Sequence, residues 1–147
     1  MVTYSAEETI GAGRKYAEHL KGGEIIGLKG ELGSGKTTFI KGLAEGLRVD
    51  ETITSPTFVI LKSYPGRIGD PSNSSGQVKK IEFIHIDAYR IESLDDIKSV
   101  GVEDYLGRSN VVVAVEWAEK IHEVLPKNTI YINFKHKKEN EREIIVG

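Results

Sequence analysis

The sequence predicts a three-layer α/β domain with a mainly parallel central sheet and antiparallel additions at one side. A strand-like run at 24–29 leads into a glycine-rich loop and then into a helical pattern. The fully apolar run at 111–115 is typical of a buried central strand. Strand and helix patterns follow the order βαβ…βαβαββ, which favours parallel strands joined by helices. A chain of 147 residues is long enough for one core and short for two, so we expect 1–147 to form a single domain.

The glycine-rich loop, residues 30–37, reads Gly-Glu-Leu-Gly-Ser-Gly-Lys-Thr and matches the phosphate-binding pattern GxxxxGK[ST]. Its place between a strand and a helix lets backbone N–H groups converge on phosphate oxygens at the helix N-terminus. In such a loop Lys36 would reach the β- and γ-phosphates, and the Thr37 hydroxyl would ligate Mg²⁺. The sequence therefore predicts a P-loop NTPase-like fold that binds a nucleoside triphosphate. A glycine-rich turn without a ligand is the less favoured interpretation.

The N-terminal half contains two helix signals. Ser5 and Glu8 match a capping box for a helix that ends at 22–23. A second helix follows the loop, and apolar residues at helical spacing predict its buried face: Phe39, Ile40, Leu43, Ala44 and Leu47. A turn at 54–57 then leads into a β-branched strand at 58–61. Residues 65–80 are loop-rich, and we interpret their centre as a mobile hairpin tip.

The C-terminal half alternates strands with short helices. We expect these elements in order: a strand at 81–86 ending on Asp87, a helix from Ser93 and Asp96 to Gly101, a strand at 111–115 ending on Glu116, a helix at 118–125 before Pro126, and strands at 129–135 and 142–146 around a polar turn at 137–141.

Asp87 and Glu116 each follow directly after an apolar strand. A P-loop ATPase needs an acid near its metal, and in open α/β sheets ligands bind at the carboxyl ends of the strands. Either acid could instead cap the next helix, but the apolar strand before Glu116 suggests a central position beside the loop. A carboxylate close to a triphosphate needs Mg²⁺ between them. We therefore expect one acid to hold the metal and the other to orient water or a loop.

Three further side chains have open interpretations. Thr57 would be either a switch-like threonine near the γ-phosphate or part of a turn around Pro56, and the spacing favours neither. Arg90 is a candidate to stabilise charge at the γ-phosphate, but an ion pair with Asp87 or Glu92 is the preferred interpretation. His85 is expected to pack or hydrogen-bond within its strand.

Composition narrows the class of protein. The net charge of −2 provides no general attraction to nucleic acid, so direct tRNA binding by the chain alone is not expected. The basic cluster Lys135-His136-Lys137-Lys138 is interleaved with acids and is read as a solvated turn. The absence of cysteine excludes disulfides and thiolate metal sites. With no signal-like or membrane-spanning run, we expect a cytoplasmic protein without a membrane partner.

Three other function classes share a phosphate loop. A small-molecule kinase usually has an arginine-rich lid, whereas the arginines here are scattered. A signalling GTPase needs an Asn-Lys-x-Asp guanine-reading motif, which the chain lacks. A nucleotide-gated interaction protein would bind nucleotide without significant hydrolysis, and only an assay separates it from a slow ATPase.

Four motifs in order give the chain a specific resemblance. They are Gly-Glu-Leu-Gly-Ser-Gly-Lys-Thr-Thr-Phe at 30–39, Ser-Pro-Thr-Phe at 55–58, His-Ile-Asp-Ala-Tyr-Arg at 85–90 and Val-Glu-Trp-Ala-Glu-Lys at 115–120. Together they resemble the bacterial TsaE (YjeE) family over nearly the whole chain. That family is the small ATPase that works with TsaD and TsaB to install threonylcarbamoyl on adenosine in tRNA. Glu141 stands where the family usually has glycine, and Ala118 where it usually has proline.

The resemblance implies a set of site residues. Lys36, Glu116, Asp87 and Thr57 would form the catalytic group, with Thr37 and Glu116 at Mg²⁺ and Trp117 beside the site. ATP would contact Gly33, Ser34, Gly35, Lys36, Thr37, Thr38, Asp87 and Arg142. The implied activity is Mg-ATP hydrolysis that is slow alone and raised by the TsaB–TsaD complex, with tRNA contacted only through that complex.

Overall fold

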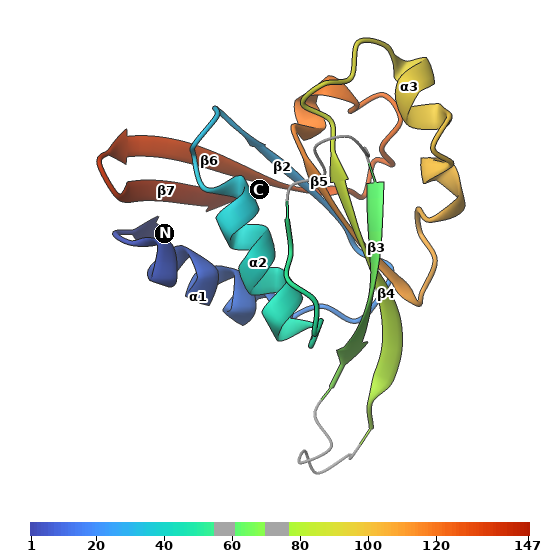
Figure 1. Ribbon diagram of the computed structural model, residues 1–147, viewed down its shortest axis with the longest axis horizontal. Coiled ribbons are helices and arrows are strands. Elements are labelled where there is room, and N and C mark those ends of the chain that lie inside the picture. Colours follow the sequence, from blue (N-terminus) through green and yellow to red (C-terminus); the bar gives the residue numbers. More distant parts are fainter. Residues whose placement is uncertain (55–60, 70–76) are drawn as a thin grey trace.

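The computed structural model describes residues 1–54, 61–69 and 77–147, and these form a seven-stranded sheet with helices on both faces (Figure 1). The strand order across the sheet is β1-β7-β6-β2-β5-β4-β3. In chain order the elements are β1 (Val2–Thr3), α1 (Ala6–Ala17), β2 (Ile25–Gly30), α2 (Lys36–Gly46), β3 (Leu61–Ile68), β4 (Lys79–Asp87), α3 (Leu94–Lys98), β5 (Val111–Glu116), β6 (Ile130–Lys138) and β7 (Glu141–Val146), with short 3₁₀ helices η1 (Val102–Asp104) and η2 (Ala118–Lys120).

The centre of the sheet is parallel, as predicted. β2 pairs in parallel with both β5 and β6, and β5 pairs in parallel with β4. Antiparallel strands occur at both edges, because β3 pairs with β4 on one side while β7 and the two-residue β1 extend the other. The expectation that antiparallel strands lie at one side only was therefore wrong. A two-residue edge strand such as β1 is too short to leave a pattern in the sequence.

Residues 65–68 and 79–80 of the loop-rich stretch belong to strands, which its composition did not suggest. β3 continues through Pro65 and Gly66 to Ile68, and Pro65 pairs with Glu82 of β4. An edge strand tolerates proline because its outer N–H positions need no partner. The antiparallel pair predicted at this point is present, and its strands are longer than expected. The expected mobile tip falls on residues 70–76, which lie outside the described residues.

Two helix boundaries also differ from expectation. α1 ends at Ala17, several residues before the glycine pair. The segment 118–125 forms η2 and turns in place of a continuous helix: Trp117 before it has a φ of 60°, and Ile121 after it has a φ of −129°. Segments of this length depend on packing for helical stability. Turns, and not a helix, bring Ile121 and Leu125 into buried positions against the sheet.

The core consists of two apolar layers, one on each face of the sheet. α1 and α2 cover one face, and the predicted stripe of α2 is buried there: Phe39, Ile40, Leu43, Ala44 and Leu47. α3, η1 and η2 cover the other face with Ile97, Val102 and Ala118. This is the three-layer arrangement that the sequence predicted.

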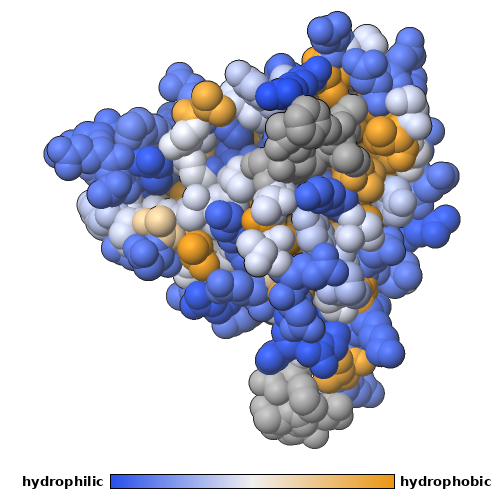
Figure 2. All heavy atoms as spheres, in the orientation of Figure 1, coloured by the Kyte–Doolittle hydropathy of each residue, from blue (hydrophilic) through white to orange (hydrophobic). Residues whose placement is uncertain are grey.

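α1 and α2 approach each other closely through glycine. A Cβ atom on Gly42 of α2 would lie 2.0 Å from the backbone oxygen of Ile10 in α1. The two helices are also joined by an exposed ion pair, in which Arg14 Nη2 lies 2.8 Å from Glu45 Oε2. The surface seen in Figure 2 is largely polar, with apolar side chains in small separate groups. Across the described residues, none of the helices has the length and apolar character needed to cross a bilayer.

Candidate nucleotide-binding site

The sheet register brings the predicted acids together beside the glycine-rich loop. Glu116, the last residue of β5, is in register with Leu28 of β2 on one side and with Asp87 of β4 on the other. Side chains alternate between the faces of a strand, so His85 and Asp87 share the face of Phe83, which packs under α2. Loop, acids and the start of α2 therefore meet at the carboxyl ends of three adjacent parallel strands.

The loop itself has the backbone that its glycines permit. Gly33 has a φ of 78° and Gly35 a φ of 105°, which is the left-handed region that glycine occupies without strain. Gly35 is the N-cap of α2, so the positive end of the helix and its free N–H groups open onto the loop. Ser34 is buried inside the loop, and Thr37 and Thr38 lie partly exposed in the first turn of α2. This is a suitable cradle for phosphate oxygens.

Lys36 is folded back onto its own loop. Its side chain is buried, and its Nζ donates to the backbone oxygens of Gly30 and Glu31, the latter at 2.9 Å. The third contact of the ammonium is Ser34 Oγ at 3.4 Å. An ammonium group has three N–H donors, and Lys36 already makes three contacts within the loop. A phosphate that binds Lys36 must therefore replace these contacts.

The charges around Lys36 are mainly negative. Burial lowers the pKa of Lys36, and four nearby carboxylates oppose that shift: Glu116, Glu119, Asp87 and Glu31. A triphosphate that is bound here through Lys36 alone would lie close to these carboxylates. The negative charges of the two groups would repel each other. A divalent cation between the two sets of oxygens removes the repulsion.

Glu116 is held at both carboxylate oxygens. Thr37 Oγ1 donates to Glu116 Oε1 at 2.6 Å, and His85 Nε2 lies 2.7 Å from Glu116 Oε2. The side chains of His85 and Glu116 are 0% and 4% exposed. His85 Nδ1 is buried and has no hydrogen-bond partner among the described residues. A buried polar atom left unpaired destabilises a fold by about 1–3 kcal/mol.

The donor set fits Mg²⁺. Magnesium prefers hard oxygen ligands and in ATPases is usually held by one or two protein groups together with phosphates and water. Thr37 and Glu116 supply a hydroxyl and a carboxylate in direct contact at the mouth of the loop. In the described part of the chain no cluster of three or more His, Asp or Glu side chains could hold a metal alone. The residues present therefore suit a metal shared with a nucleotide.

Asp87 lies next to Glu116 and is partly buried. Its Oδ1 accepts a hydrogen bond from the backbone N–H of Tyr89 at 3.0 Å, which fixes the turn after β4. Burial raises the pKa of Asp87, and the charge of Glu116 adds to the increase. The capping and site interpretations of this residue are thus compatible, because the same carboxylate orders the turn and faces Glu116.

Trp117 covers one side of Lys36. The Lys36 Nζ lies 4.0 Å from the centre of the Trp117 ring, and Tyr89 packs against that ring with centroids 5.1 Å apart. Lys120 Nζ donates to the backbone oxygen of Tyr89 and lies 5.2 Å from the Tyr89 ring centre. The structure therefore places this tryptophan against the P-loop lysine.

Arg142 reaches the loop from β7. A Cβ atom on Gly35 would lie 3.8 Å from Cγ and Cδ of Arg142. The Arg142 guanidinium donates through Nη1 to the backbone oxygens of Glu139, at 2.7 Å, and Glu141. Arg142 is therefore adjacent to the predicted nucleotide site, with its guanidinium held by the β6–β7 turn.

The other candidates lie elsewhere or cannot be placed. Thr57 falls in 55–60, outside the described residues. Arg90 is exposed, and in the described ranges no ion pair joins it to Asp87 or Glu92, so the preferred ion-pair interpretation was wrong. In the basic cluster, Lys137 lies 3.6 Å from Glu143, consistent with a solvated turn.

His85 is the site residue that sequence reasoning missed. It is fully buried, so the expectation that it packs is confirmed, but its hydrogen bond goes to the neighbouring strand β5 and not within β4. Two signals in the sequence pointed to it: His85 is the first residue of the 85–90 motif, and it stands two residues before Asp87, which puts both side chains on one face. That Glu116 lies within reach depends on the β4–β5 register, which the sequence does not specify.

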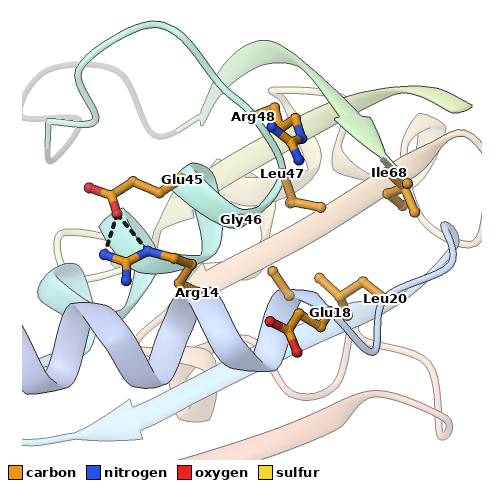
Figure 3. A pocket seen from close by; sticks show the side chains of 10 residues that line it. Arg14, Glu18, Leu20, Glu45, Gly46, Leu47, Arg48 and Ile68 are labelled. Atoms are coloured by element: carbon orange, nitrogen blue, oxygen red, sulfur yellow. Dashed lines mark hydrogen bonds and ion pairs between the residues drawn. The ribbon is translucent and has the colours of Figure 1, made fainter. Parts of the chain in front are cut away.

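A separate cavity lies at the far end of α1 and α2. It has a volume of about 490 Å³, and its lining includes Glu18, Gly46, Leu47 and Ile68, with the Arg14–Glu45 ion pair at its edge (Figure 3). α2 begins at the phosphate loop and ends at this cavity. The cavity is therefore not part of the nucleotide site.

Comparisons with known proteins match nearly the whole chain. A family model described as "Threonylcarbamoyl adenosine biosynthesis protein TsaE" matches residues 3–144. The tRNA threonylcarbamoyladenosine biosynthesis protein TsaE of Treponema pallidum is 36% identical over 146 residues, covering 99% of this chain and 98% of that protein. The Bacillus subtilis protein of the same name is 37% identical over 142 residues, covering 97% and 80%. The crystal structure of Bacillus subtilis YdiB superposes with a TM-score of 0.68 at 35% identity, covering 99% of this chain and 82% of that one. The chain belongs to the TsaE family.

Proposed function

We propose that this chain is the ATP-hydrolysing component of tRNA threonylcarbamoyladenosine biosynthesis. The observation that carries the proposal is the contact between Thr37 Oγ1 and Glu116 Oε1 at the mouth of the phosphate loop. It joins a hydroxyl and a carboxylate, the two protein groups that a shared Mg²⁺ requires in a P-loop ATPase. The names of the relatives support the pathway.

The chemistry proposed is in-line attack of water on the γ-phosphate of ATP. A bond forms between the water oxygen and phosphorus while the bond to the β–γ bridging oxygen breaks, giving ADP and phosphate. Bound Mg²⁺ supplies charge neutralisation at the phosphate oxygens. Lys36 and the N–H groups of the loop and of α2 stabilise the charge that builds up in the transition state. Asp87, beside Glu116, is placed to orient the attacking water or the turn at Tyr89.

The proposed turnover is slow without a partner. An arginine at the γ-phosphate is worth about 10³–10⁵ in rate in related phosphoryl-transfer enzymes. Arg142 lies against the loop, but its guanidinium is engaged with backbone oxygens of the β6–β7 turn. Arg90 is exposed. We infer that the TsaB–TsaD complex completes either the catalytic site or the conformational cycle to which hydrolysis is coupled. We infer also that tRNA is contacted through that complex.

Nucleotide binding is tested by the fluorescence of Trp117, the single tryptophan of the chain. Because Lys36 lies against its ring, a nucleotide that draws Lys36 to its phosphates should change the emission. We expect Lys36→Ala to weaken ATP binding by about 10- to 100-fold, as loss of charge-assisted hydrogen bonds predicts. Lys41→Ala, an exposed lysine of the same helix, is the matched control and should bind normally. Equal affinity of the two variants would contradict nucleotide binding at the loop.

A further inference from the structure

The pair formed by His85 and Glu116 has no counterpart in the phosphate-loop pattern. His85 is fully buried on the face of β4 that packs under α2, where its neighbour Phe83 is also fully buried. An apolar side chain at position 85 would be enough to fill this part of the core. The histidine instead leaves its Nδ1 buried, with no partner among residues 1–54, 61–69 and 77–147, and places its Nε2 at 2.7 Å from Glu116 Oε2. A buried polar side chain with one unpaired atom calls for a reason other than packing.

The hydrogen-bond direction follows from the chemistry of the two groups. An ionised carboxylate only accepts, so His85 Nε2 carries the hydrogen and donates to Glu116. Thr37 Oγ1 donates to the other oxygen of the same carboxylate. The two donors come from different elements, β4 and α2, and together they fix the plane in which the Glu116 oxygens lie. A glutamate without them would be free to change its side-chain rotamer.

We propose that His85 is a positioning residue that holds Glu116 in the orientation needed at the metal-facing edge of the site. Its Nε2 contacts the Glu116 carboxylate, and it acts through that carboxylate. The partner of a metal-site carboxylate typically contributes 10- to 100-fold to metal affinity or activity. The inference rests on the proposed Mg-nucleotide function and assigns to this site a buried residue that the loop motif does not include.

The first test measures Mg²⁺ dependence without relying on turnover. Trp117 emission is followed during Mg²⁺ titration of the protein with ADP, and the ADP affinity is measured separately without Mg²⁺. His85→Leu removes the donor at similar volume and should raise the Mg²⁺ midpoint by about 10-fold or more. Its Mg²⁺-free ADP affinity should stay within about twofold of wild type, since the loop contacts of the phosphates are untouched.

Matched variants separate positioning from packing. The amide nitrogen of glutamine occupies nearly the place of histidine Nε2, whereas that of asparagine falls short of Glu116. His85→Gln should therefore restore the midpoint to within about threefold of wild type, and His85→Asn should not. Phe83→Leu disturbs the same buried face two residues away and should leave the midpoint unchanged. If His85→Leu does not fold, the glutamine and asparagine pair gives the same comparison.

The outcomes distinguish this inference from the proposed function. Wild-type protein whose emission responds to neither ADP nor Mg²⁺ overturns the proposed function and the inference with it. A wild-type response with equal midpoints in the glutamine and asparagine variants overturns the inference alone. Loss of Mg²⁺-free ADP binding in His85→Leu, or an equal shift in Phe83→Leu, assigns His85 a structural role only. An ¹⁵N spectrum of the nucleotide-free protein should show His85 as the Nε2–H tautomer, and the Nδ1–H tautomer would contradict the donor role.

Discussion

At the level of single residues, the site is organised around Glu116. One of its oxygens accepts from Thr37 at the start of α2, and the other from His85 of β4. Lys36, the cation of the loop, is buried nearby and experiences the charge of Glu116. Replacing this glutamate therefore changes both the charge balance and the edge at which we propose that Mg²⁺ binds, while the proposed phosphate-binding loop stays intact.

Glu116→Ala should retain nucleotide and hydrolyse little. We expect ATP hydrolysis to fall by about 10- to 100-fold or more, as for other groups that set metal geometry. Binding of a fluorescent ADP analogue should remain measurable, because Lys36 and the loop amides are unchanged. Glu103→Ala, an exposed acid on η1, is the control. Wild-type turnover in the Glu116 variant would contradict its assigned role.

Asp87 predicts a pH dependence of stability. Burial, reinforced by Glu116, raises the pKa of Asp87 above its ordinary value of 3.8. The folded state therefore holds the proton more tightly than the unfolded state. The stability contributed by the protonated form is fully present below pH 3.8 and is lost as the pH rises through the raised pKa.

Asp87→Asn should therefore stabilise the fold at neutral pH. The amide oxygen can still accept from the Tyr89 N–H, while the unfavourable charge is absent. Urea unfolding should show a higher midpoint than wild type at pH 7, and the difference should shrink as the pH falls toward 3.8. Asp50→Asn, at an exposed position, controls for the change in net charge. A gain that grows on acidification would contradict the sign.

The residues of the loop could be predicted from the sequence, whereas His85, which contacts Glu116 from β4, could not. Lys36, Thr37 and Glu116 were predicted because a short motif and a strand end carry their chemistry. The placement of Arg142 beside Gly35 came from family resemblance, not from spacing. His85 was missed because its partner lies on another strand, 31 positions away, and only the register of β4 with β5 brings the two together.

At the level of elements, the contact between α1 and α2 sets the position of the loop. α2 carries Lys36 and Thr37 in its first turn, and it packs against α1 through Gly42. Because the Gly42 Cα faces the Ile10 carbonyl, the helices are as close as their backbones allow. Any side chain at this point must push α2, and the loop with it, away from α1.

Gly42→Ala and Gly11→Ala should act in opposite directions. A Cβ on Gly42 would clash with the Ile10 backbone at 2.0 Å, and overpacking of this kind destabilises by about 1–3 kcal/mol. Gly11, within α1, has nothing within 4 Å of the added atom, so alanine should stabilise the helix by roughly 0.5–1 kcal/mol. Thermal unfolding of both variants tests this. Equal stabilities would show that the helices can separate at no cost.

Element prediction succeeded where the sequence pattern is long and failed where packing decides. The buried strand β5 and the apolar stripe of α2 were identified from runs that tertiary contacts reinforce. The segment after Trp117 was predicted as a helix, yet it forms η2 and turns because so short a helix depends on its neighbours. β3 was cut short because Pro65 and Gly66 read as a loop, although an edge strand accepts both.

At the level of the whole molecule, the fold class and family were predicted correctly. A parallel centre with helices on both faces follows from the alternation of patterns. The family was predicted from four short motifs between residues 30 and 120, and the family model matches residues 3–144. Strand β1 was not foreseen, because it has only two residues and pairs with β7 from the opposite end of the chain. Pairings between distant segments are the part of a topology that local patterns specify least.

The central claim is that hydrolysis of ATP by this chain is coupled to a partner complex. The most direct measurement is steady-state ATP hydrolysis with Mg²⁺ by the purified chain, alone and with its cognate TsaB–TsaD pair, using Glu116→Ala as the blank. We expect weak activity that rises with the partners and disappears in the blank. Activity that is indifferent to the partners, or no hydrolysis in any mixture, would contradict it.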